Sequence, residues 1–394
     1  MNFRRYTWTI LAGILMPIAL VLALNLLRTN KYRAHDRFLQ ASEWQEKTHG
    51  MTMAVLPGYK GQYRSGPFKV LRLNDRLLAI NAMVFGASTA MGIQEDMFPP
   101  PIRIYNFAHH ANLQTEVMGE IKYALDHFEH VRWMFVPLEW AMGFLFLPGD
   151  PKTADLSRAG ALHDIETKDT HPIGASLKEA LSYPQIRALF TILYSALTSN
   201  DTRERLYRAF FQSYNDEYLC PNGVTRDYEP YPWRGCVGLQ AGFQYDGSMD
   251  FGRSGNADIQ HELVRLSAFL PTTRGQPREE LLDQLAVYAN RLEQRGGQMI
   301  FFLPPVLPRL QSTILKQPGV GPYLMRAINI VKQWAEINKL ELLDFGPSED
   351  FGCTADEFVD GAHATPPCYR KAFTKIQQTR PGLFRLPSRI KQAF

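Results

Sequence analysis

The stretch that decides the fold is RLLAINAMVFG, Arg76 to Gly86, which runs directly into Ala87-Ser88-Thr89-Ala90. A short, nearly continuous apolar run is typical of a strand that is buried on both faces, as strands of parallel sheets are. Gly86 permits a sharp exit from this strand. The four residues after it are expected to open a helix.

The same alternation of strand and helix continues along the chain. Further strands are predicted at 102–107, 131–138, 299–303 and 341–345, and helices at 115–128, 278–295, 323–338 and from Pro366 onward. This alternation predicts an α/β fold with a mostly parallel sheet that is covered on both faces. Ligands of such sheets bind beyond the carboxyl ends of the strands.

A long interruption, residues 147 to about 255, predicts a helical and loop-rich insertion in the α/β domain. The expected organisation has four parts. They are a cytoplasmic tail with an anchor at 1–29, a stalk or docking segment at 30–70, the α/β domain with its insertion at 71–380, and a C-terminal tail at 381–394.

Composition excludes several classes of protein. Of the 394 residues, 45% are hydrophobic and 21% are charged, which is close to a globular average and excludes a disordered or fibrous chain. Lys plus Arg number 43 against 39 Asp plus Glu. This excess is too small to indicate a nucleic-acid partner. We predict no cofactor.

The segment Tyr6 to Leu27 contains no charged residue. A helix of this length can cross a bilayer core of about 30 Å. We expect an uncleaved membrane anchor, with Arg4 and Arg5 on its cytoplasmic side. The alternative is a signal peptide cleaved after Val21-Leu22-Ala23, which would release the protein as a free esterase.

The four cysteines form two pairs that are close in sequence, Cys220 with Cys236 and Cys353 with Cys368. Four cysteines allow three connectivities, of which two local bridges are the simplest. Disulfides form in oxidising compartments. We therefore expect the domain on the periplasmic side of the cytoplasmic membrane, with four reduced thiols as the alternative.

A candidate catalytic group combines residues from the first and last strands. Ser88 follows the first strand, and a serine hydroxyl becomes nucleophilic only when a base removes its proton. His363, after the last strand, can be that base. Asp360, three residues earlier on the same turn, can orient the imidazole. Because both segments lie at strand carboxyl ends, they can meet despite their separation in sequence.

On these residues the chain resembles the SGNH (GDSL-like) hydrolases. It is most similar to their membrane-anchored bacterial branch, which includes the teichoic-acid D-alanyl transfer protein and polysaccharide O-acetylation factors. The resemblance covers roughly Leu71 to Gln378. It rests on Phe85-Gly86-Ala87-Ser88, Tyr105-Asn106-Phe107-Ala108 and Asp360-Gly361-Ala362-His363. It implies a three-layer α/β/α sandwich with a five-stranded sheet, Ser88 as nucleophile, His363 as base and Asp360 as its orienter.

The oxyanion-hole positions depart from this family. The family places a Gly after strand two and an Asn after strand three, where this chain has His109-His110-Ala111-Asn112 and Pro137-Leu138-Glu139-Trp140. We expect the oxyanion donors to be the Ser88 N–H with His110 and Asn112. Adjacent side chains of an extended segment point opposite ways, so His109 and His110 suit a metal ion poorly, and we predict no metal.

The resemblance implies a membrane-anchored, extracytoplasmic serine acyltransferase or esterase. Its substrates would be O-acyl groups, O-acetyl foremost, of a cell-surface or exported polysaccharide, and its partner a multi-pass membrane O-acyltransferase. The alternative is a non-catalytic accessory or binding factor of a polysaccharide modification or export complex. Aromatic residues of the insertion can stack on sugars or pack their own loop: Tyr228, Tyr231, Trp233 and Tyr245.

Overall fold

The computed structural model describes residues 66–109, 114–139, 242–251, 257–269 and 279–385, with short pieces and single positions between 23 and 64 and between 187 and 198. The expected anchor at 6–27 lies outside the described residues except for Ala23. Within the described parts of the chain, no helix is both long and apolar enough to cross a bilayer.

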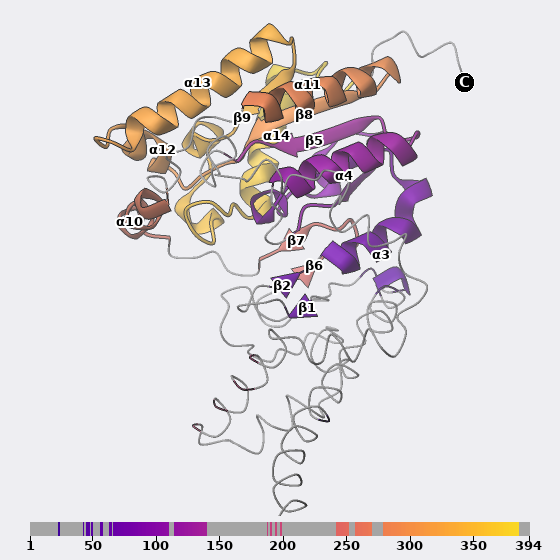
Figure 1. The fold of residues 1–394 in the computed structure, drawn as a ribbon, viewed down its shortest axis with the longest axis horizontal. Helices are drawn as coiled ribbons and strands as arrows, with labels where there is room; N and C mark the ends of the chain where they lie inside the picture. Colours follow the sequence, from indigo (N-terminus) through magenta and orange to yellow (C-terminus); the bar gives the residue numbers. More distant parts are fainter. Residues whose placement is uncertain are drawn as a thin grey trace, which may run out of the picture.

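A parallel five-stranded sheet forms the centre of the domain, and its spatial order is β4-β3-β5-β8-β9 (Figure 1). All four strand pairs are parallel, which confirms the predicted α/β class. The strands are β3 (Ala82–Val84), β4 (Ile104–Asn106), β5 (Trp133–Pro137), β8 (Gln298–Leu303) and β9 (Glu341–Asp344).

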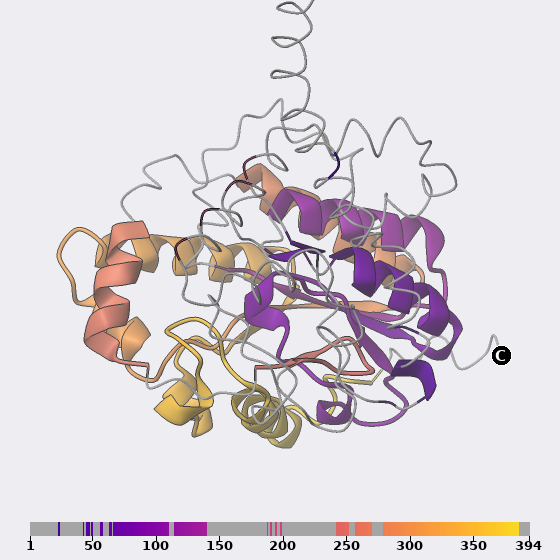
Figure 2. The same ribbon diagram turned by 90° about the horizontal axis from the view of Figure 1, so that it is seen from below.

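Helices cover both faces of this sheet, as Figure 2 shows. One face carries α4 (Gln114–His127), α11 (Glu279–Gln294) and α13 (Gly321–Ile337). The opposite face carries α14 (Pro366–Thr379). These helices match the predicted ones within a few residues. Four buried phenylalanine rings pack together between the sheet and α14: Phe98, Phe135, Phe373 and Phe384.

The predicted first strand is wrong at its beginning. Arg76 ends helix α3 (Gly66–Arg76), and a 3-10 turn at Leu77–Ala79 separates this helix from β3. The apolar run therefore contains a connector as well as a strand, and Leu78 in it is 96% exposed. The residues after β3 form only a short 3-10 turn, η3 (Ser88–Ala90), where a longer helix was predicted.

Both expected limits of the α/β domain fall within packed structure. Helix α3 crosses the expected boundary at residue 70, and Phe68 in its first turn is buried in the core. Leu383 and Phe384, at the beginning of the expected C-terminal tail, are also buried. Three of the described helices were not predicted from the sequence: α3, α10 (Ile259–Phe269) and α12 (Leu310–Leu315).

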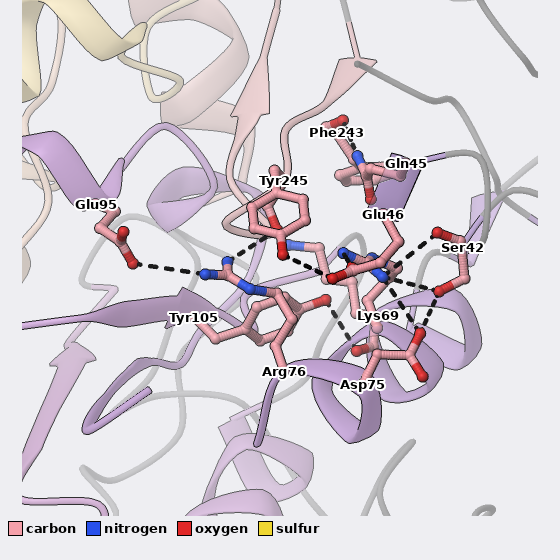
Figure 3. A network of polar contacts seen from close by, with 11 residues as sticks. Ser42, Gln45, Glu46, Lys69, Asp75, Arg76, Glu95, Tyr105, Phe243 and Tyr245 are labelled. Carbon is pink, nitrogen blue, oxygen red and sulfur yellow. Dashed lines mark hydrogen bonds and ion pairs between the residues drawn. The ribbon is translucent and has the colours of Figure 1, made fainter. Parts of the chain in front are cut away.

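A two-stranded hairpin from the expected insertion, β6 (Gly242–Phe243) with β7 (Met249–Asp250), lies beside α3 (Figure 1). Tyr245 in its turn accepts a hydrogen bond from Arg76 at its carbonyl (3.0 Å), and its ring lies 4.1 Å from that guanidinium. Its hydroxyl donates to Glu46, which also pairs with Arg72 (both 2.9 Å; Figure 3). Tyr245 therefore packs its own hairpin. The other three aromatic candidates lie outside the described residues.

Lys69 of α3 is fully buried and joins the hairpin to the end of β4. Its ammonium group donates to the carbonyl oxygens of Asn106 (3.0 Å), Gly247 (2.6 Å) and Ala108. Burial lowers the pKa of Lys69 from 10.5 to about 7, although the negative charges of Asp246 and Glu120 act to raise it.

This buried lysine predicts a pH-dependent stability. Between pH 7 and 10.5 the unfolded chain binds a proton at Lys69 that the folded chain does not, so the free energy of unfolding should rise with pH in this window. The slope from one group is at most about 1.4 kcal/mol per pH unit. Urea unfolding of the wild type and Lys69→Met at several pH values measures it. A wild-type slope equal to that of the variant would contradict the prediction.

Candidate active site

Ser88 lies at the carboxyl edge of the sheet, four residues after β3 ends. Strand β3 pairs with β4 on one side and β5 on the other, so the chain reverses its direction of winding here. Doubly wound sheets form their ligand crevices at such switch points. The predicted nucleophile therefore lies where this architecture builds binding sites.

The structure brings the three predicted residues together. The Ser88 Oγ atom lies 2.8 Å from His363 Nε2. On the other side of the ring, His363 Nδ1 lies 2.8 and 2.9 Å from the two carboxylate oxygens of Asp360. A ring nitrogen that donates to a carboxylate leaves the other nitrogen as an acceptor. His363 can thus accept the hydroxyl proton of Ser88.

The turn that carries Asp360 and His363 is held by hydrogen bonds from its backbone to the Asp360 side chain. Asp360 Oδ1 also accepts the N–H groups of Ala362 (2.8 Å) and His363 (3.0 Å). The Asp360 carboxylate therefore fixes both the main chain of the turn and the imidazole of His363. This explains why an aspartate three residues before a histidine can orient its ring.

A disulfide closes the segment around this turn. Cys353 and Cys368 are bonded, as predicted, and both side chains are buried. Cys368 lies in the first turn of α14, so the bridge ties the beginning of the segment that contains Asp360 and His363 to this helix. Cys220 and Cys236 lie outside the described residues.

Gly86 makes the turn between β3 and Ser88 possible. Its φ angle is +125°, and a Cβ atom there would lie 2.3 Å from the Pro137 side chain of the neighbouring strand. An L side chain would therefore meet both backbone strain and a collision.

Gly86→Ala is expected to lower the free energy of unfolding by about 3 kcal/mol or more, since strain and overpacking each cost about 1–3 kcal/mol. Denaturant unfolding measures this, with Gly382→Ala as the control because nothing lies within 4 Å of a Cβ there. Equal stabilities of the two variants would show that the turn relaxes around the added methyl group.

The predicted oxyanion donors are placed only in part. The Ser88 N–H donates no hydrogen bond to any described residue, so it remains available as a donor. His110 and Asn112 lie outside the described residues. The neighbouring Asn106 amide instead donates to the carbonyls of Ala90 (2.9 Å) and Ile93 (2.8 Å) and so holds the loop that follows Ser88.

His109 forms a buried pair with Glu120 of α4, at 2.8 Å. Its backbone N–H donates to the Gly86 carbonyl at 3.2 Å. Within the described residues, no group of three or more metal-ligating side chains comes together.

Three residues near the site were not predicted as functional. Glu139, after β5, and Thr89, after Ser88, form a buried hydrogen bond with each other. The Phe251 ring, after β7, lies 6.2 Å from the His363 ring. A lone carboxylate after a buried strand is a sequence signal for Glu139. Phe251 carries no such signal, because a long insertion brings it to the site.

No protein-family model matches the chain, and no curated protein matches it. The roles of Ser88, His363 and Asp360 therefore rest on this chain's own motifs and geometry.

Proposed function

We propose that the protein is a serine acyltransferase or esterase of the SGNH type, acting on O-acyl groups of a cell-surface or exported polysaccharide. The observation that carries the proposal is the hydrogen-bonded series Ser88–His363–Asp360. Ser88 and His363 are 275 positions apart in sequence and 2.8 Å apart in space, and His363 lies 2.8 Å from Asp360. Such a series is the arrangement that activates a hydroxyl for acyl transfer.

In the first half-reaction, Ser88 Oγ attacks the carbonyl carbon of an acyl donor while His363 Nε2 takes the hydroxyl proton. Asp360 stabilises the imidazolium that forms. The Ser88 N–H is available to bind the developing oxyanion. The tetrahedral intermediate then collapses. The leaving oxygen receives the proton from His363, and the acyl group remains on Ser88 as an ester.

In the second half-reaction, a second hydroxyl gives its proton to His363 and attacks the carbonyl carbon of this ester. The bond between the acyl group and Ser88 Oγ then breaks, and Ser88 Oγ takes the proton back from His363. A sugar hydroxyl yields the acylated glycan, and water yields the free acid. Transfer and hydrolysis therefore use the same residues and differ only in the nucleophile that reaches the acyl-enzyme.

The proposed location is the extracytoplasmic face of the cytoplasmic membrane, with residues 6–27 as the anchor. The Cys353–Cys368 disulfide supports an oxidising compartment. A multi-pass membrane O-acyltransferase is the proposed acyl supplier, on the sequence resemblance alone.

Covalent labelling tests the nucleophile. The full-length protein in detergent is expected to form one adduct with a fluorophosphonate, located at Ser88 by peptide mass spectrometry. Ser88→Ala should form none and should not transfer acetyl to a deacetylated polysaccharide. A wild-type protein that takes no label would contradict the proposal and favour a non-catalytic accessory role.

A further inference from the structure

Glu139 is a buried carboxylate that the mechanism above does not use. It lies two residues after the end of β5, at the carboxyl edge where Ser88 follows β3. Its side chain accepts a hydrogen bond from the hydroxyl of Thr89, and the backbone N–H of Ala87 helps to lower the pKa of this carboxyl. These groups belong to the residues directly before and directly after Ser88.

We infer that Glu139 is a positioning residue for the nucleophile: through Thr89 it holds the turn that carries Ser88, so that the Ser88 hydroxyl faces His363. This inference rests on the proposed function. The hydrogen bond between Glu139 and Thr89 fixes the turn from the β5 side, and the Ser88 N–H is left without a partner among the described residues.

A second contact, from helix α14, also holds this turn. Tyr369 of α14 is fully buried, and its hydroxyl donates to the Thr89 carbonyl at 2.5 Å. Thr89 is therefore bound through its side chain by Glu139 and through its main chain by Tyr369. Because the turn has only three residues, a displacement of Thr89 displaces Ser88.

The groups around Glu139 stabilise its negative charge within the protein interior. Burial raises the pKa of this carboxyl, while the Thr89 hydroxyl, the charge of His363 and the Ala87 N–H lower it. A buried carboxylate is costly unless its hydrogen bonds are satisfied. The Thr89 hydroxyl, in the turn that carries Ser88, supplies such a hydrogen bond. A leucine at position 139 would remove both the free-energy cost of burying a charge and the contact that positions the turn.

The test compares paired variants of the full-length protein by rate of fluorophosphonate labelling and by kcat and KM for acetyl-ester hydrolysis. Glu139→Leu and Thr89→Val should each lower the labelling rate and kcat about 100-fold, the loss expected when reacting groups are misplaced by about 1 Å, with KM unchanged. Glu139→Gln keeps an acceptor and Thr89→Ser keeps a hydroxyl, so both should stay within about tenfold of the wild type.

Two further variants complete the test. One controls for a loss of folding, and the other shows whether Thr89 and Glu139 act through the same interaction. Val331→Ala, on the buried face of α13, loses packing at a helix that carries none of the three triad residues and should keep the wild-type labelling rate per folded molecule. The double variant Thr89→Val/Glu139→Leu should be no slower than either single variant, because both remove one interaction.

The outcomes distinguish the two proposals. A wild type that is labelled at Ser88, with Glu139→Leu labelled equally fast, overturns the positioning role and leaves the proposed function intact. Slow labelling of Glu139→Gln as well as Glu139→Leu, without rescue, also overturns it. A wild type that is not labelled overturns the proposed function, and the positioning role with it.

Discussion

Replacing Asp360 by asparagine is expected to lower kcat for acyl transfer or ester hydrolysis about 10⁴-fold, the size of effect known for the orienting aspartate of serine triads. Asp360 accepts the Nδ1–H of His363, and an amide in its place can present an N–H to the ring instead. The imidazole would then expose a protonated Nε2 to Ser88 and could not remove the hydroxyl proton. KM should change little, because the change does not touch the acyl donor.

The control for this prediction is Asp356→Asn. Asp356 lies in the same disulfide-closed segment, in the 3-10 turn Ala355–Glu357, and its side chain is exposed. It should retain activity within about threefold, as expected for a surface substitution away from special features. An Asp360→Asn protein with wild-type kcat would exclude Asp360 as the orienting residue.

Removing the disulfide as Cys353→Ala/Cys368→Ala is expected to lower the free energy of unfolding by about 3 kcal/mol, the chain-entropy value for a loop of about 15 residues. Asp360 and His363 both lie within the segment that the bridge closes. We therefore expect a loss of activity in molecules that remain folded, because the unbridged turn samples positions in which His363 no longer reaches Ser88.

Denaturant unfolding and the labelling rate at Ser88 separate the two effects. The double variant Cys220→Ala/Cys236→Ala is the comparison, since those cysteines lie far from the catalytic turn in sequence. A lower stability with an unchanged labelling rate would show that the bridge stabilises the fold without shaping the site.

The fold class follows from the sequence because strands buried on both faces leave a simple pattern. The core of each central strand is apolar on both faces, and the intervening helices have apolar positions at helical spacing. The pattern does not separate Leu77–Ala79 from the strand after it, because an apolar connector and an apolar strand look alike. Only the packing of α3 shows that the chain turns at Arg76.

The candidate site was predictable where its chemistry is local. Asp360 and His363 share one turn, and Gly86 marks the sharp exit before Ser88. The contact of Glu139 with Thr89 depends instead on two strands that lie side by side, with Val84 opposite Phe135. Sequence reading interpreted Glu139 only as the absence of an asparagine. It gave no sign that the neighbouring turn supplies a hydroxyl, that of Thr89, to the buried carboxylate.

The arginines of α3 have a practical consequence for anyone who shortens this protein. Arg72 and Arg76 are almost fully buried. Arg72 binds Ser42 and Glu46, which come before α3 begins at Gly66 in the sequence. A fragment trimmed to Gly66 would strip Arg72 of these counterparts and remove the anchor point of the Tyr245 hydroxyl. Shortened fragments should therefore begin before Ser42, so that the contacts of Arg72 with Ser42 and Glu46 and of Tyr245 with Glu46 are kept.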